Sequence, residues 1–178
     1  AGIATHFVES TALDSVRVQS AGAKNADAAL AKMLGELHED TGAPKELTPE
    51  NRARIDRIFA LDSVEAIVAA LETDGSDWAK VQMKTLSVKS PQTLKVAFRQ
   101  LREGAKMQSF ADEMRQEYAI GARVVQRHDF LEGVRALIVD KDNAPKWDPP
   151  ALSGVTDKML DEIFAPLPPG EAWTPLIE

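Results

Sequence analysis

The 178-residue chain contains no cysteine, and this absence removes several kinds of chemistry at once. Disulfides, thiolate nucleophiles and thiolate metal ligands all require that side chain, and its absence fits a reducing compartment. Histidine is also scarce. His6, His38 and His128 lie too far apart in the sequence to form a His-x3-His pair on a helix. We therefore expect no metal site.

Long apolar runs and an excess of basic residues are missing as well. No run approaches the roughly 18 residues that a membrane-spanning helix needs. The first residues, AGIATHFVES, have neither the basic nor the apolar region of a secretory signal. The 21 Lys and Arg residues are outnumbered by 28 Asp and Glu, for a formal net charge of −7. Since a nucleic-acid-binding domain needs a basic face, we expect a soluble protein with neither a nucleic-acid nor a membrane partner.

Aromatic residues make up only 6% of the chain, whereas helical periodicity runs through most of it. Capping residues, prolines at first helical positions and i, i+3, i+4, i+7 apolar stripes predict an all-α fold of about eight helices. The expected helices include residues 28–37, Thr48-Pro49 to 59, Asp62 to Asp74-Gly75, 77–86, Ser90-Pro91 to Gly104, Ser109 to about Arg127, Asp129 to Val139 or Lys141, and Thr156 to 164.

Apolar spacing also predicts which side each helix buries. The expected buried sets are Val64, Ile67, Val68 and Leu71; Leu94, Ala97, Phe98 and Leu101; Phe110, Met114 and Tyr118; Val134, Leu137 and Ile138; and Met159, Leu160, Ile163 and Phe164. Gly104 is expected in the left-handed conformation that ends a helix. Prolines between Asn143 and Pro150 predict an extended surface segment that Trp147 holds in place.

The first eight residues read as a short β-strand, because Ile3, Phe7 and Val8 are apolar and Thr5 is β-branched. No second strand is predicted downstream. A single strand leaves its backbone hydrogen bonds unpaired, so it implies a sheet that this chain does not contain. A terminus without fixed structure is the alternative.

No motif for catalysis is present in the sequence. There is no Gly-x-Ser-x-Gly nucleophile motif, no Gly-rich phosphate loop and no Gly-x-Gly-x-x-Gly fingerprint. The acidic run from Glu36 to Asp40 is typical of a solvated helix face. His38 and Glu39 are neighbours on a predicted helix, point roughly 100° apart and do not form an acid–base pair. We expect no catalytic residue within this chain.

Basic residues gather in one part of this acidic protein. Between Asp77 and Asp112 the sequence carries seven Lys and Arg residues and one Glu. Three of them, Lys95, Arg99 and Arg102, fall at i, i+4 and i+7 and share one face of the predicted helix. Such a stripe would attract an anion with several phosphates. The alternative is a solubilising outer face whose charges pair with acidic residues elsewhere.

Several stretches of the chain resemble one enzyme family. They are AGIATHFV, SPQTLKVAFRQLREG, EYAIGARVVQRHDFLEGVRALIVDKDNAPKW and FAPL. Together they are similar to the C-terminal part of 3-hydroxyisobutyryl-CoA hydrolases, within the crotonase (enoyl-CoA hydratase/isomerase) superfamily. The resemblance runs nearly from end to end and is most specific at 90–101 and 129–147.

The resemblance implies that this chain is the helical C-terminal portion of a crotonase-like fold. Residues 1–19 would be a remnant strand and first helix of the core, 20–74 a helical lobe, and 75–178 a C-terminal lobe that covers the active site. In the family, the oxyanion hole and the catalytic carboxylates precede the point that corresponds to Ala1, so none can be assigned here. The expected partners are the missing N-terminal half, an acyl-CoA substrate and, in one possibility, further copies of the chain.

The same resemblance implies which residues lie near coenzyme A. In the superfamily, an EG-x-x-A-F-x-E-K-R tail contributes an aromatic residue and a lysine near the adenine. Here Glu132, Gly133 and Ala136 match, Leu137 replaces the aromatic residue, and Lys141 is the nearest lysine after a one-residue shift. The implied substrate-binding residues are Lys141, Arg99, Lys95 and Leu137, with no catalytic residue, no metal ligand and no cofactor beyond the acyl-CoA substrate.

The function implied for the parent protein is hydrolysis of a β-hydroxyacyl-CoA thioester in valine breakdown, in the bacterial cytoplasm or the mitochondrial matrix. The fragment alone is expected to be inactive. One alternative is a hydratase or isomerase built on the same scaffold. Another is a stand-alone helical interaction module, which would expose few apolar side chains, whereas a portion of a larger enzyme would expose a large apolar patch.

Overall fold

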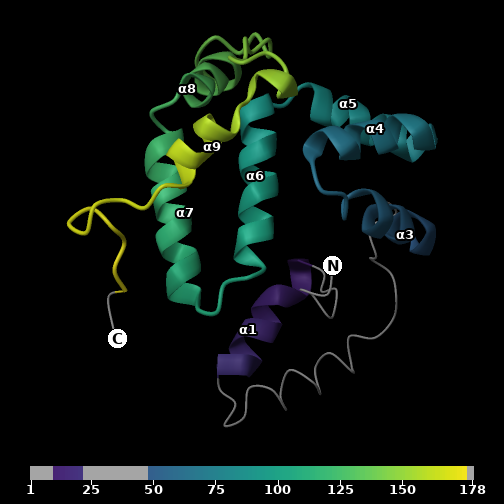
Figure 1. Ribbon diagram of the computed structural model, residues 1–178. Coiled ribbons are helices and arrows are strands. Elements are labelled where there is room, and N and C mark those ends of the chain that lie inside the picture. The colour runs from purple at the N-terminus through teal and green to yellow at the C-terminus, as the bar shows by residue number, and fades with distance from the viewer. Residues whose placement is uncertain (1–9, 22–47, 176–178) are drawn as a thin grey trace. The chain divides into compact units, whose positions relative to one another are not determined.

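The computed structural model describes residues 10–21 and 48–175 (Figure 1). The chain divides into two compact units, Ala1–Arg54 and Ile55–Glu178. In the first unit the described elements are a 3-10 turn, η1 (Ser10–Ala12), helix α1 (Leu13–Ala21) and the beginning of α3 (Pro49–Ile58). The predicted strand at residues 1–8 and the predicted helix at 28–37 lie outside the described residues.

The second unit holds most of the described helices. They are α4 (Val64–Asp74), α5 (Asp77–Ser87), α6 (Pro91–Gly104), α7 (Phe110–Val124), α8 (His128–Val134), a π-helical turn η2 (Arg135–Val139), a 3-10 turn η3 (Leu152–Gly154) and α9 (Asp157–Phe164). Figure 1 shows α6 and α7 side by side, with α9 packed against both, and α4 packed against α5. Every regular element in the described residues is helical, so the all-α prediction is confirmed.

Two clusters of buried side chains form the interior of this unit. The first joins α6, α7 and α9 and consists of Val96, Ile120, Val155, Leu160, Ile163 and Phe164. The second joins the end of α3 to α4 and α5 and consists of Ile58, Ile67, Leu71 and Ala79. The predicted buried stripe of α9 is confirmed at Leu160, Ile163 and Phe164, and that of α4 at Val64, Ile67 and Leu71.

The predicted helix starts are confirmed where a hydroxyl caps the helix. The Oγ1 of Thr48 accepts the backbone N–H of Asn51, and Ser90, Ser109 and Thr156 each accept the N–H three residues on. These bonds satisfy donors that the first turn leaves unpaired. The start predicted at Asp62 is wrong by one residue, because the Ser63 hydroxyl accepts the N–H of Ala66 instead.

The start predicted at Asp129 is also wrong, since α8 begins at His128 and has no side-chain cap. Asp129 itself is buried and bonds elsewhere. At the other end of α7, the helix stops at Val124 and not near Arg127.

The two glycines expected to end helices behave differently. Gly75 has a φ of 61°, and its N–H bonds to the Leu71 carbonyl, as a left-handed helix terminus requires. The same prediction for Gly104 is wrong, because α6 runs through Gly104 and Ala105 follows it with a φ of −58°. A Cβ at Gly104 would lie 2.8 Å from the Oε2 of Glu113, so glycine here leaves room for the Glu113 carboxylate beside α6.

Three predicted buried faces are corrected by the structure. On α6 the buried side is formed by Gln92 and Val96, whereas Ala97 and Leu101 are exposed. On α7, Ala119 and Ile120 are buried, and the predicted Phe110 and Tyr118 are exposed. In η2 only Ala136 is buried, and the predicted Leu137 and Ile138 are exposed. Each segment has apolar residues on more than one side, so spacing alone does not choose between them.

The segment between η2 and η3 follows the prediction in part, because Trp147 holds it in place as expected, but Asn143 has a φ of 52° and is not extended. Residues 141–150 contain no helix or strand, and the indole Nε1 of Trp147 donates to the Val88 carbonyl at 3.2 Å. The division of the chain at residues 19 and 74 stays a prediction. Helices α4 and α5, which flank Gly75, pack against each other.

Candidate functional site

The region with the strongest family resemblance folds into a fixed turn made of α8, η2 and the residues that follow. The guanidinium of Arg135 lies at the centre of this turn. Its Nε and Nη2 donate to the two carboxylate oxygens of Glu132 at 2.8 Å, and its Nη1 donates to Asp140 and Asp142 at 2.7 Å. The N–H of Asn143 also returns to the Ala136 carbonyl at 3.1 Å. One arginine therefore holds three carboxylates from both sides of the π-helical turn.

The charges of this turn stabilise one another. Arg135 lowers the pKa of Glu132 to about 2, and the backbone N–H of Lys146, at 2.7 Å, adds to the shift. The pKa of Asp142 is also lowered, by Arg135 and by the N–H of Ala144. In turn, the hydrogen bonds that Arg135 donates to Glu132, Asp142 and Asp140 raise the pKa of Arg135 above its usual value. These shifts favour the charged forms of Glu132, Asp142 and Arg135, so the ion pairs stabilise the turn at neutral pH.

A buried carboxylate connects the turn to the rest of the second unit. Asp129 accepts a short hydrogen bond from the Ser90 hydroxyl, which is the cap of α6, and another from the N–H of Asp148 at 2.8 Å. The Nδ1 of His128 lies 3.2 Å from the same carboxylate. Asp129 thus joins the start of α6, α8 and the extended segment. Sequence reasoning missed this role, since Ser90 and Asp129 are 39 residues apart and only the fold brings them together.

The outer side of the turn is apolar. Phe130, Leu131, Leu137, Ile138 and Val139 are between 43% and 68% exposed, and we call these five residues the α8–η2 apolar surface. Several exposed apolar side chains on one short segment are typical of a surface that another polypeptide or a ligand covers. The internal bonds of Arg135 and Asp129 keep this surface in one arrangement.

Two of the residues predicted to bind substrate, Leu137 and Lys141, lie on this turn. Leu137 belongs to the α8–η2 apolar surface. Lys141 follows η2 with a φ of 57°, and its side chain is exposed. Within residues 10–21 and 48–175, the Lys141 ammonium has no hydrogen-bond or ion-pair partner. An exposed apolar side chain and an exposed cation therefore belong to the same short segment.

The other two, Lys95 and Arg99, lie on α6 and are held by acidic residues. Lys95 forms an ion pair with Glu65 at 2.6 Å, which lowers the pKa of that carboxyl, and also donates to the Val155 carbonyl. Arg99 pairs with Glu103 at 2.6 Å and Asp161 at 2.7 Å. The third residue of the stripe, Arg102, donates to two backbone carbonyls before α4. The basic stripe thus joins α6 to α4 and α9.

The described residues contain no group of three His, Asp or Glu side chains placed to hold a metal ion. In the same residues, none of the helices combines the length and the apolar character needed to cross a membrane. The turn carries exposed apolar side chains and the exposed cation Lys141, a combination suited to binding an anionic ligand with an apolar part.

Comparison with known proteins identifies the family. The sequence model described as enoyl-CoA hydratase/isomerase matches residues 1–164, and the chain belongs to that family. The family indicated by the sequence motifs is thereby confirmed. Two solved structures share the fold: a carnitinyl-CoA dehydratase from Mycobacterium thermoresistibile, with 33% identity and a TM-score of 0.75, and an enoyl-CoA hydratase from Rhodobacter sphaeroides, with 28% identity and a TM-score of 0.73. The match covers 93% and 98% of this chain, but 46% and 48% of theirs.

Curated relatives carry a narrower description. The 3-hydroxyisobutyryl-CoA hydrolases of Gallus gallus and Danio rerio, both described as mitochondrial, are 41% and 39% identical to this chain. The human protein of the same description is 35% identical. The matches cover 93–94% of this chain and 44% of each relative. The chain therefore spans less than half the length of the curated relatives it matches.

Proposed function

We propose that this chain is the C-terminal helical portion of a coenzyme A thioester hydrolase that acts on 3-hydroxyisobutyryl-CoA or a similar β-hydroxyacyl-CoA. The reaction adds water to the thioester and releases the carboxylic acid and free coenzyme A. The groups that activate water and stabilise the thioester oxygen belong to the remaining portion of the protein. This chain covers the acyl-CoA and has no turnover by itself.

The proposal rests on the agreement between the sequence identity to the curated hydrolases and the structure of the segment where the resemblance is strongest. The relatives described as 3-hydroxyisobutyryl-CoA hydrolases are 35–41% identical over nearly all of this chain. The stretch of strongest resemblance is also the one that folds into the locked turn with an uncovered apolar surface. A lid over a thioester site needs such a surface, because excluding water protects the bound substrate and strengthens polar contacts around it.

For individual residues we propose that Lys141 contacts a phosphate of coenzyme A. We also propose that Leu137 packs against the coenzyme A part of the bound substrate. The exposed ammonium of Lys141 supports this role, since no ion pair with another described residue competes with the phosphate. Lys95 and Arg99 are further candidates for phosphate contact. Each would have to share its cation with the carboxylate that it already binds.

The test compares this chain with the complete protein as its source produces it. Release of coenzyme A from 3-hydroxyisobutyryl-CoA is followed with a thiol reagent, to which this chain adds no background because it has no cysteine. We expect release by the complete protein and none by the 178-residue chain. Thiol release by the chain alone would contradict the proposal.

Lys141 has a matched control on the same segment. In the complete protein, Lys141→Met should raise KM for the thioester about tenfold, the equivalent of ~1.4 kcal/mol for a lost charge-assisted phosphate contact. Lys146→Met changes an exposed lysine five residues further on and should leave KM unchanged. Equal KM values for the two variants would remove Lys141 from the site.

A second candidate function is hydration of an enoyl-CoA or the reverse dehydration. It is favoured by the solved structures, which are described as a carnitinyl-CoA dehydratase and an enoyl-CoA hydratase. Hydration consumes the absorbance of the conjugated thioester without releasing a thiol. Loss of absorbance without thiol release by the complete protein would select this function over hydrolysis.

We also propose a location inside the mitochondrial matrix or, for a bacterial source, the cytoplasm. The curated relatives described as mitochondrial support the first possibility. Fractionation of source cells with an antibody against this chain tests it, and recovery from the culture medium would contradict both locations.

A further inference from the structure

A second uncovered region lies far from the α8–η2 turn along the two long helices. It is a groove of about 790 Å³ between the end of α6 and the beginning of α7, and we call it the α6–α7 groove. Leu101 and Phe110 contribute its apolar walls and are 76% and 77% exposed, more than any other large apolar side chain in the described residues. Two bulky side chains in water beside a hollow indicate a surface that is normally covered.

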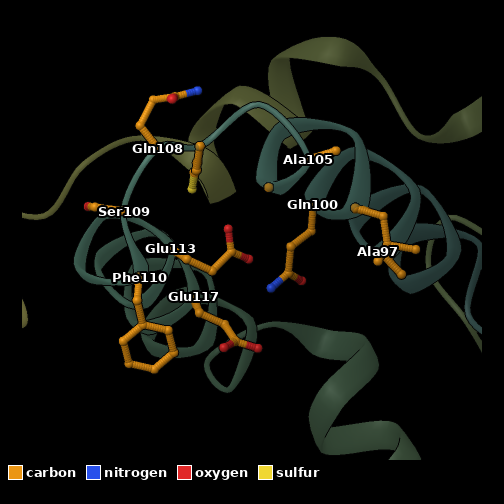
Figure 2. Close-up of a pocket in the computed structure, with 11 residues that line it drawn as sticks. Ala97, Gln100, Ala105, Gln108, Ser109, Phe110, Glu113 and Glu117 are labelled. Atoms are coloured by element: carbon orange, nitrogen blue, oxygen red, sulfur yellow. The ribbon is translucent and has the colours of Figure 1, made fainter. Parts of the chain in front are cut away.

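The groove also carries negative charge. Figure 2 shows Gln100 from α6 and Glu113 and Glu117 from α7 pointing toward one another across it. The two glutamates are one helical turn apart, so their charges repel. Neither carboxylate has a hydrogen-bond or ion-pair partner within the part of the chain that the structure describes. By contrast, Glu103 and Asp112 nearby are both paired with arginines.

One of these carboxylates lies close to the backbone of α6. The Oε2 of Glu113 is 2.8 Å from the position that a Cβ at Gly104 would take, so the absence of a side chain at Gly104 leaves room for it. A carboxylate that is brought close to an apolar wall without a partner is costly to desolvate. An apolar occupant alone would bury both charges unpaired, so the occupant must also bring a cation.

We propose that the α6–α7 groove docks a helix from the portion of the complete protein that lies outside this chain. That helix presents a bulky apolar side chain to Leu101 and Phe110 and a Lys or Arg between Glu113 and Glu117. This inference rests on the proposed function in one respect, namely that the complete protein has the length of its curated relatives. More than half of each relative lies outside the matched part. A segment of the same polypeptide reaches the groove at a high effective concentration, which a second copy of the chain does not.

The first experiment places a photocrosslinker in the groove of the complete protein. Phe110 is replaced by p-benzoylphenylalanine, which keeps the aromatic ring at a solvent-exposed position and does not disturb the core. We expect irradiation to join position 110 to one helix outside the 178 residues, next to a Lys or Arg. The matched control is the same crosslinker at Val81, a 60% exposed residue of α5 outside the groove, which should give no such product.

Other results overturn the inference. Crosslinks to residues 1–178 of the same copy would mean that the chain covers its own groove. Crosslinks between copies, recognised by mixing isotopically light and heavy protein, would mean that the occupant is a second chain. Absence of any crosslink would mean that the groove is open to water.

The second experiment tests the charge requirement. Glu117→Lys should reduce the crosslinking yield from position 110 about tenfold, while Glu117→Asp should retain it, because only the first variant repels the cation. Unchanged yield in Glu117→Lys would contradict the proposed cation.

Thioester hydrolysis is measured on the same samples to separate the two proposals. Activity together with crosslinks inside residues 1–178 would reject the docking inference alone. Crosslinks to the outside helix without thioester hydrolysis would reject the proposed function alone.

Discussion

In α9, Leu160, Ile163 and Phe164 are buried against α6 and α7, whereas in the α8–η2 turn Leu137 and Ile138 face water. Both segments have apolar residues at helical spacing. The difference lies in what the described residues supply to cover them, because α9 packs against α6 and α7, whereas Leu137 and Ile138 stay exposed within those residues. Apolar periodicity therefore identifies a side that is built for contact, and it does not tell whether the contacting group belongs to the same chain.

The largest effect is expected from truncating the same residue type in both regions. Ile163 is completely buried and Ile138 is 65% exposed. Ile163→Ala should lower the free energy of unfolding of this chain by roughly 2–5 kcal/mol, through lost transfer energy and the cavity left behind. Ile138→Ala should change it by less than about 0.5 kcal/mol. Urea titration followed by circular dichroism measures both.

Similar losses in the two isoleucine variants would break the comparison. They would mean that the α8–η2 turn is covered in this chain in solution. A loss at Ile138 that depends on protein concentration would point to association of copies through the apolar surface.

The next largest effect concerns the carboxylate that fixes the turn. Asp129→Ala leaves the Ser90 hydroxyl and the Asp148 N–H without their buried acceptor, which should cost about 1–3 kcal/mol. Asp77→Ala removes an exposed carboxylate that pairs with Lys80 and should cost no more than about 1 kcal/mol. Hydrogen exchange gives the local readout, since the Asp148 amide should lose protection in Asp129→Ala while amides of α9 keep theirs. Unaltered protection of Asp148 would show that Asp129 does not hold the extended segment.

These two regions also show how far the sequence could predict the structure. Helix starts at Ser90, Ser109 and Thr156 depend on a hydroxyl and an N–H three residues away, so local pattern was sufficient. The start of α8 could not be found this way. Asp129 resembles a capping residue, but its carboxylate bonds to Ser90, and only tertiary structure decides between these partners.

The sequence was sufficient to predict which segment forms the candidate site. It was not sufficient to predict how that segment folds. The family motif located Leu137 and Lys141 on the right segment, and whether they bind substrate stays a prediction. Nothing in the spacing signalled a π-helical turn or the bridging of three carboxylates by Arg135 across it. The basic stripe of α6 was correctly seen as one face, but the acids that pair with Lys95 and Arg99 include Glu65 and Asp161 from other helices, which the sequence alone could not assign.

A smaller effect on the free energy of unfolding is expected from lowering the pH. This effect arises in the α8–η2 turn and not in the core. The folded pKa of Glu132 is about 2, below its usual value of 4.5, because Arg135 binds the charged form. The stabilisation from this group is complete above pH 4.5 and is lost as the pH falls toward 2, since the unfolded chain takes up the proton first. The free energy of unfolding of Glu132→Gln should therefore fall less than that of the parent chain between pH 4.5 and pH 2.

The control for the acid experiment is Glu72→Gln, at an exposed glutamate of α4. Its stability should follow the pH profile of the parent chain. A profile of Glu132→Gln that coincides with both would show that the bond between Glu132 and Arg135 does not form in solution.

The smallest change in stability is expected where the comparison began, at the apolar surface itself. Leu137→Ser and Ile138→Ser together should leave the free energy of unfolding nearly unchanged and should clearly reduce the fluorescence of a hydrophobic dye bound to the native chain. Val81→Ser removes an exposed apolar side chain that lies outside the surface and should leave dye binding unchanged. If the double variant binds as much dye as the parent, the α8–η2 apolar surface is not the exposed patch, and Leu101 and Phe110 of the α6–α7 groove become the first residues to replace.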